Sequence, residues 1–180
     1  MDTFKKDLYR YFGTEKISIK ILLYIILFPH LLYMFYFRMV HNTGVVIKLF
    51  FRILLLLKST KTQIQIPAET EIGEGFYIGH WGRVIINGKA KIGRNVNIAT
   101  GVTIGQTNRG PNKGCPVIGN NVWIGTNAVI VGNINIGDDV LIAPLSFVNV
   151  SVPDHSIVIG NPAKIIYREN ATKDYINKTV

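Results

Sequence analysis

Aliphatic residues recur at a spacing of six over the second half of the chain. A period of six matches neither the 3.6-residue period of a helix nor the two-residue alternation of a strand. The inward positions are Ile66, Ile72, Ile78 and Val84, then Ile86, Ile92, Ile98 and Ile104, then Ile118, Ile124, Ile130, Ile136, Ile142 and Val148. Each hexapeptide is predicted to supply one short strand with its aliphatic residue inward, and three hexapeptides to form one triangular coil. The pattern predicts a mainly β, parallel β-helix of about four to five coils.

The six-residue register slips twice, first between Val84 and Ile86 and then between Ile104 and Ile118. The second slip contains the segment QTNRGPNKGCP, from Gln106 to Pro116, which is polar and rich in Gly and Pro. Such a segment does not fill a coil. We therefore expect a loop over 106–117 that projects from the prism, where binding sites are commonly built on a rigid scaffold.

The pattern divides the chain into three parts: a helical, basic and apolar region over 1–61, the β-helix over 62–166, and a tail over 167–180. The tail is expected to pack as a short strand or helix and then to fray. In the first region the apolar run from Ile21 to Phe37 has 17 residues and is interrupted by Pro29 and His30. This run is short and broken for a helix that crosses a bilayer.

Basic side chains follow one another beside the apolar positions of this region. Arg38, His41, Lys48 and Arg52 form a basic stripe next to a broad apolar face. The pattern favours an interfacial helix on anionic lipid. The alternative is a helical cap that packs on the β-helix or on a neighbouring subunit, and both arrangements are compatible with the sequence.

The net charge of +9 and the pI near 9.7 favour an anionic partner, such as a phosphorylated cofactor, an acidic glycan, a membrane surface or a nucleic acid. The interleaved aromatic and basic pattern of nucleic-acid-binding modules is missing, so no nucleic acid is expected. The single cysteine, Cys115, excludes an intrachain disulfide and a cysteine zinc cluster. Because no cleavage site follows an apolar run near the N-terminus, we expect a cytoplasmic protein, with the inner face of the membrane as its candidate peripheral contact.

Four segments carry a resemblance to a known family. They are IPAETEIGEGFYIGHWG (Ile66–Gly82), GVTIGQTNRGPNKGCPVIG (Gly101–Gly119), VWIGTNAVIVGNINIGDDV (Val122–Val140) and VPDHSIVIGNPAKII (Val152–Ile166). They resemble the hexapeptide-repeat acyltransferases, and more closely the serine O-acetyltransferase branch together with its polysaccharide O-acetyltransferase relatives. The resemblance implies a left-handed winding, acetyl-CoA as co-substrate, and a homotrimer that binds coenzyme A between adjacent prisms.

The same resemblance assigns the catalytic base to His80, within YIGHWG. A hydroxyl is a poor nucleophile until a base removes its proton, and an imidazole titrates near neutral pH. The alternative for His80 is a polar corner residue. For His30, His41 and His155 ordinary structural roles are expected, and no metal site is expected.

Several positions depart from the serine-specific pattern of the family. Gly79 stands where that branch has an acidic residue, Gln65 where it has an aspartate, and Gly114 and Cys115 where it has an arginine–histidine pair. The loss of these charges favours a neutral acceptor, so the expected activity is acetylation of a sugar hydroxyl on a polysaccharide or glycan precursor. The alternative is serine O-acetylation, and a second alternative is a β-helix scaffold without catalysis.

The candidate acceptor-binding residues are Gln65, Trp81, Arg83, Cys115 and Trp123. Trp81 is suited to stacking on a pyranose ring, and Arg83 to meeting an acidic sugar or the cofactor. A packing tryptophan and a solvated arginine are equally acceptable interpretations. By resemblance Trp123 borders the acyl and acceptor site, with coil-edge packing as the alternative. Cys115 is expected to be a loop residue near the acceptor and not a covalent nucleophile.

The resemblance also places residues along coenzyme A. Those expected beside the pantetheine arm are Gly105, Gln106, Gly125, Thr126 and Ala143, and Lys164 is expected near the nucleotide end. Small residues matter there because the ligand approaches the backbone closely. Pro144 and Leu145 depart from the small residues usual at that corner.

Overall fold

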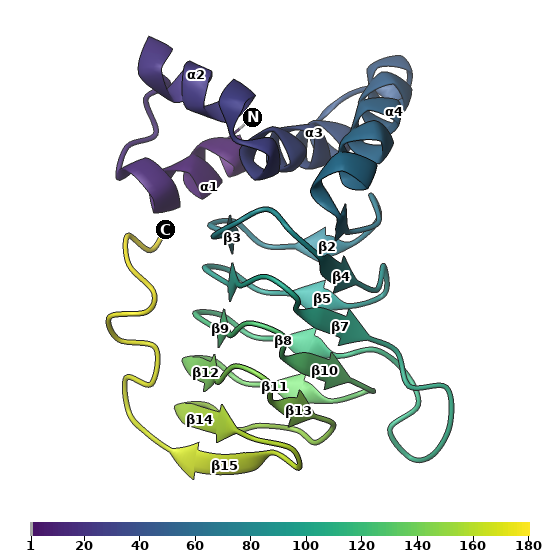
Figure 1. Ribbon diagram of the computed structural model, residues 1–180, viewed down its shortest axis with the longest axis vertical. Helices are drawn as coiled ribbons and strands as arrows, with labels where there is room; N and C mark the ends of the chain where they lie inside the picture. The colour runs from purple at the N-terminus through teal and green to yellow at the C-terminus, as the bar shows by residue number, and fades with distance from the viewer. Residues whose placement is uncertain (1) are drawn as a thin grey trace.

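The computed structural model describes residues 2–180, in which four helices precede all of the strands. The helices are α1 (Asp2–Phe12), α2 (Ile19–Leu27), α3 (Pro29–Asn42) and α4 (Val45–Thr62). The strands are β1 (Ile64–Gln65), β2 (Glu71–Ile72), β3 (Tyr77–Ile78), β4 (Val84–Ile86), β5 (Lys91–Ile92), β6 (Asn97–Ile98), β7 (Thr103–Gly105), β8 (Val117–Ile118), β9 (Trp123–Ile124), β10 (Val129–Val131), β11 (Asn135–Ile136), β12 (Val140–Ile142), β13 (Phe147–Val148), β14 (Ser156–Ile159) and β15 (Lys164–Tyr167). The helices sit together at one end of a stack of coils (Figure 1).

Successive strands fall on three different sheets in turn, which is the topology of a triangular β-helix. The sheets have the orders β1-β4-β7-β10-β13, β11-β8-β5-β2 and β15-β14-β12-β9-β6-β3. We call them sheets A, B and C. All pairs are parallel except β14 with β15, which is antiparallel. The predicted fold class is confirmed: a mainly β parallel solenoid of about five turns.

The core of the prism consists of the predicted six-residue series, and these side chains are buried apart from the half-buried Ile72. The first slip in register has a simple cause. Strand β4 has three residues, and side chains alternate between the two faces of a strand, so Val84 and Ile86 both point inward. The second slip is the loop between β7 and β8, which projects from the prism (Figure 1).

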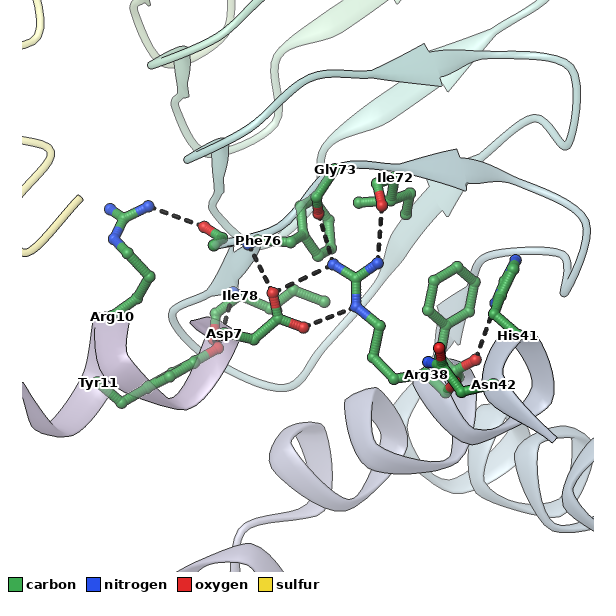
Figure 2. A network of polar contacts seen from close by, with 12 residues as sticks. Asp7, Arg10, Tyr11, Arg38, His41, Asn42, Ile72, Gly73, Phe76 and Ile78 are labelled. Atoms are coloured by element: carbon green, nitrogen blue, oxygen red, sulfur yellow. Dashed lines mark hydrogen bonds and ion pairs between the residues drawn. The ribbon is translucent and has the colours of Figure 1, made fainter. Parts of the chain in front are cut away.

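The helices are fixed to the first coil by a buried ion pair, shown in Figure 2. The Arg38 Nε donates to Asp7 Oδ2 at 2.7 Å, and the two side chains are only 5% and 2% exposed. Arg38 also donates to the carbonyl oxygens of Ile72 and Gly73, at 2.7 and 2.6 Å. The predicted basic stripe is therefore wrong for Arg38, because burial and pairing remove its charge from the surface.

The tail lies along sheet C instead of fraying. The Asp139 carboxylate accepts hydrogen bonds from the backbone N–H groups of Ala171 and Thr172, both at 3.0 Å. At the end of the tail, the Asn95 side chain donates to the Val180 carbonyl and accepts from the Val180 N–H. The chain end thereby reaches back to the helical end of the prism, as Figure 1 shows for the yellow segment. Side-chain hydrogen bonds to the tail backbone replace the strand pairing that its sequence lacks.

Helices α2 and α4 leave much of their apolar surface uncovered: Leu27 is 71% exposed and Val45 is 85% exposed. Across residues 2–180, no helix taken alone has both the length and the apolar character needed to cross a membrane. The pair α2 and α3 passes that test jointly, but the two helices meet at a bend of 98°.

Candidate functional site

His80 lies at the corner where the chain leaves sheet C and enters sheet A. The strand before it, β3, is held by Tyr11 of α1: the Tyr11 hydroxyl donates to the Ile78 carbonyl at 2.8 Å and accepts from the Ile78 N–H at 2.9 Å. The Tyr11 ring also stacks on Tyr77, with 4.3 Å between ring centroids. His80 itself is exposed. A rigid support thus presents an accessible imidazole at the edge of the prism.

Two further helices contact the same corner. The Trp81 ring stacks on His30 of α3, with centroids 6.0 Å apart and an interplanar angle of 23°. Phe28, just before α3, lies 6.4 Å from the same ring. The Gly82 N–H donates to the Thr62 carbonyl at the end of α4, at 3.1 Å. The helical region is therefore a structural support of the His80 corner.

Sequence reasoning gave His30 an ordinary structural role but did not place it at this corner. It is 5% exposed, and its Nδ1 has no hydrogen-bond partner in the described structure. The pKa of His30 is lowered to about 4, mainly by burial and to a smaller extent by the nearby His80. A neutral imidazole therefore adds no positive charge beside His80 near pH 7.

The depressed pKa of His30 predicts a pH-dependent stability. Between pH 6.5 and about 4 the unfolded chain binds a proton at His30 that the folded chain does not, so stability falls as the pH falls. His30→Gln is expected to remove about 2–3 kcal/mol of this acid loss. The measurement is urea unfolding of wild type and variant at several pH values in that window.

His155 provides the matched control for this prediction. The hydrogen bond that His155 Nδ1 donates to the Asp139 carboxylate raises the pKa of His155, so its contribution to stability is present at low pH and is lost as the pH rises. His155→Gln should therefore steepen the acid loss, whereas His30→Gln should flatten it. If the free energies of unfolding of His30→Gln and wild type changed with pH in parallel, His30 would not be held neutral in the folded protein.

Three of the predicted cofactor residues lie on the same edge of the prism as His80. At the His80 corner, the Gly79 N–H donates to the carbonyl of Ile98 in the next coil. At the equivalent corners of later coils, the Gly125 N–H donates to the Ile142 carbonyl and the Ala143 N–H to the Val158 carbonyl. The corners of successive coils, including Thr126, therefore follow one line that begins at His80. Gly125 is also required by the fold, because an added Cβ would lie 2.6 Å from the Pro144 nitrogen.

The other two pantetheine candidates lie at the opposite edge of sheet A. Gly105 ends β7, and Gln106 begins the projecting loop, where its Oε1 lies 3.8 Å from the Cys115 sulfur. Strand β7 runs across sheet A from the His80 edge to the loop, a path of roughly 10 Å for three residues. Within one chain, His80 and the loop are therefore separated by the width of a sheet.

The environment of Cys115 does not favour a nucleophile. Burial raises the pKa of the Cys115 thiol, and the charge of Lys89 offsets this only in part. The reactive species of a cysteine is the thiolate. Cys115 therefore fits the expected loop residue. The described residues contain no group of three His, Cys, Asp or Glu side chains that could hold a metal ion.

The remaining candidates lie apart from one another. Gln65 lines a groove of about 430 Å³ beneath α4, together with Arg52 and Leu56. Trp123 lies on sheet C, where the ring of Tyr175 from the tail covers it with 4.8 Å between centroids. Lys164 is exposed on β15, at the far end of the prism, and Arg83 is exposed beside His80. Of the acceptor candidates, only Trp81 and Arg83 belong to the same corner between β3 and β4 as His80.

The fold and the repeat define the class of protein. The family described as "Bacterial transferase hexapeptide (six repeats)" matches residues 115–149. The chain is 42% identical over 103 residues to serine acetyltransferase 2 of Arabidopsis thaliana and 36% identical over 123 residues to a serine acetyltransferase of Synechococcus elongatus. These matches cover 57% and 68% of this chain but 32% and 50% of the relatives, so the chain spans at most about half of their length.

Solved structures extend the likeness to the helices. The crystal structure of Neisseria gonorrhoeae serine acetyltransferase in complex with serine matches 92% of this chain and 68% of its own, with a TM-score of 0.74 and 28% identity. That of serine acetyltransferase from Brucella abortus in complex with coenzyme A matches 93% and 67%, with a TM-score of 0.77 and 27% identity. The predicted resemblance to hexapeptide-repeat acyltransferases of the serine O-acetyltransferase type is confirmed.

The prediction of a glycan acceptor and of a role in polysaccharide biosynthesis is wrong. The two sequence relatives and the two solved structures are all serine acetyltransferases, and one of those structures contains serine. The prediction rested on the charges missing at Gly79, Gln65, Gly114 and Cys115. Missing charges at four positions do not define an acceptor.

Proposed function

We propose that this chain is an acetyl-CoA-dependent serine O-acetyltransferase. The observation that carries the proposal is the likeness, over more than nine-tenths of this chain, to serine acetyltransferase structures that hold serine and coenzyme A. The accessible His80 on a corner supported by three helices is consistent with it. Serine O-acetylation was the alternative activity that the sequence left open.

In the proposed reaction His80 is the general base. Its imidazole takes the proton of the serine hydroxyl while the hydroxyl oxygen attacks the thioester carbonyl of acetyl-CoA. A tetrahedral intermediate forms, and a backbone N–H is the expected donor to its oxyanion. As the carbon–sulfur bond breaks, the thiolate of coenzyme A takes the proton from the His80 imidazolium. The products are O-acetylserine and coenzyme A, and the base is regenerated.

Serine is a zwitterion, so its carboxylate and ammonium groups need partners. Arg83 is three residues after His80 and exposed, and a guanidinium binds a carboxylate through two parallel hydrogen bonds. We assign Arg83 to the carboxylate of serine. Gly79 leaves the ammonium group without the acidic neighbour of the family pattern, so the affinity for serine is expected to be modest.

The cofactor site is proposed along the line of corners that starts at His80. Gly125, Thr126 and Ala143 would contact the pantetheine arm, and Lys164 the phosphates at the nucleotide end. Gly105 and Gln106 lie at the opposite edge of sheet A, so they complete the groove only if a second chain contributes them. We therefore propose a homotrimer, in which cyclic symmetry places the loop of one subunit beside His80 of the next.

The proposal is tested by the acceptor dependence of thiol release from acetyl-CoA. L-serine should stimulate release and yield O-acetylserine, identified by mass spectrometry, while D-serine and L-alanine should not. L-alanine lacks the hydroxyl, and D-serine presents it with the wrong geometry. Release that is independent of L-serine would contradict the proposal.

A further inference from the structure

Two helices present many apolar side chains to solvent at the end of the molecule opposite the last coil. These residues, here called the apolar helical surface, are Ile19, Leu22, Leu23, Ile26 and Leu27 of α2 and Val45, Val46, Ile47, Leu49 and Phe50 of α4. Each is at least 45% exposed. Figure 1 shows α2 and the first turns of α4 at this end, remote from β15. Exposed apolar patches of this kind mark interaction sites.

The inner faces of the same helices are well packed, so the exposure is not a sign of loose structure. Ile21 and Ile25 of α2 are buried, and Tyr24 stacks on Phe28 with 5.1 Å between centroids. In α4, Leu55 is buried and Phe51 lies edge-on to Phe35 at 6.0 Å. Each helix thus has one face in the protein core and a second apolar face that is left uncovered.

The charged side chains of the two helices have one sign. Residues 17–68 contain no Asp or Glu, whereas Lys20, Lys48 and Arg52 are exposed on α2 and α4. Lys48 and Arg52 occupy successive turns of α4, interleaved with the exposed Leu49, Phe50 and Ile53. An apolar face bordered by bases is the composition of helices that lie in the headgroup layer of anionic membranes.

A second copy of this chain is a poorer occupant than a lipid surface. Self-association through the apolar helical surface would bring the same bases of two subunits together, with no acidic residue from 17–68 to neutralise them. Anionic headgroups supply the opposite charge, and acyl chains supply the apolar contact.

We propose that the apolar helical surface docks this protein on the surface of an anionic bilayer. The β-helix would then project from the membrane. The His80 corner would lie at the end of the prism nearer to the lipid, because α1, α3 and α4 all contact it. The proposal is independent of the acceptor, since it rests on exposure and charge of the helices alone.

The test is co-sedimentation of the full chain with vesicles of phosphatidylcholine alone or with about one-third phosphatidylglycerol. Wild type is expected to bind the anionic vesicles and to be released by high salt. Lys48→Glu, Arg52→Glu should weaken binding at least about tenfold, because each base near an anionic surface contributes to attraction. The matched control is Arg168→Glu, Lys173→Glu, which makes the same change in net charge at exposed positions after β15. It should bind nearly as well as wild type.

A second variant separates the lipid from a protein partner. Ile26→Gln, Phe50→Gln removes apolar contact and keeps every base, and circular dichroism checks that it remains folded. Loss of vesicle binding without a change in sedimentation coefficient supports the proposal. Wild type that stays off anionic vesicles, or equal loss of binding in the Arg168→Glu, Lys173→Glu control, overturns it. If wild type instead sediments as a larger assembly than the Gln variant, the surface is an interface between copies of this chain, which also overturns it.

Discussion

His80→Ala is expected to lower kcat for acetyl transfer by about 10²–10⁴-fold, the usual loss when a general base is removed. The serine hydroxyl would then have no group positioned to take its proton as it attacks the thioester. Stability should change little, because the His80 side chain is exposed. Steady-state kinetics with L-serine and acetyl-CoA, together with thermal unfolding, measures both effects.

His155→Ala is the control, since His155 is also an exposed histidine but is paired with Asp139 at 2.9 Å, away from the His80 corner. Its effect on kcat should be small. A loss from His155→Ala as large as that from His80→Ala would show that the base is wrongly assigned.

The His80→Ala variant also tests whether the site is shared between subunits. A second inactive variant is made by replacing loop residues 106–115 with a short Gly–Ser linker. After dissociation and reassembly of an equal mixture with His80→Ala, about a quarter of the sites in random trimers would combine an intact His80 with an intact loop from a neighbour. Recovered activity supports the shared site. Mixtures as inactive as their components would place the complete site within one chain.

The largest effect on stability is expected from Asp7→Asn. This change leaves Arg38 buried with its charge uncompensated, and breaking a buried pair by removing one partner costs about 3–5 kcal/mol. The Asp7 carboxylate also accepts a hydrogen bond from the Phe76 N–H at 2.9 Å, just before β3. Urea unfolding of the variant and wild type measures the loss.

Glu74→Gln provides the comparison, because the Lys6–Glu74 pair is partly exposed, at 36% and 26%, and such pairs contribute about 0–1 kcal/mol. Comparable losses from the two variants would contradict the view that the network in Figure 2 attaches the helices to the prism. Because this network adjoins β3, the Asp7→Asn variant is also expected to lose activity at temperatures where it remains folded.

The β-helix was predictable because its stability depends on a local repeat. Each six-residue unit supplies one inward side chain, and a side chain such as Ile98 stacks on its counterparts Ile78 and Ile124 in the neighbouring coils, so every unit meets the same requirement. Even the slip between Val84 and Ile86 obeys strand alternation. The projecting loop was equally visible, since the segment after Gln106 has neither the spacing nor the composition of a coil.

The surroundings of His80 were not predictable, because they depend on contacts between residues far apart in the chain. His30 meets Trp81 across 51 positions, and Arg38 meets Asp7 across 31. Neither contact has a periodic signal in the sequence. Arg38 was placed in an exposed stripe because a helical pattern shows which face of the helix a side chain is on, but not whether another element covers that face. For the same reason, the charges missing from the family pattern at positions such as Gly79 and Gln65 were a poor guide to the acceptor.

Acetyl transfer to serine with His80 as the base is tested most directly by following the acetyl group itself. With acetyl-CoA labelled with ¹³C at the carbonyl, nuclear magnetic resonance distinguishes the thioester from an ester. Wild type with L-serine is expected to convert the thioester signal into that of an O-acetyl ester on the serine hydroxyl, and His80→Ala to leave the thioester signal unchanged over the same time. A label that stays on coenzyme A in the presence of wild type and L-serine, or an ester that forms as fast with His80→Ala, would contradict this mechanism.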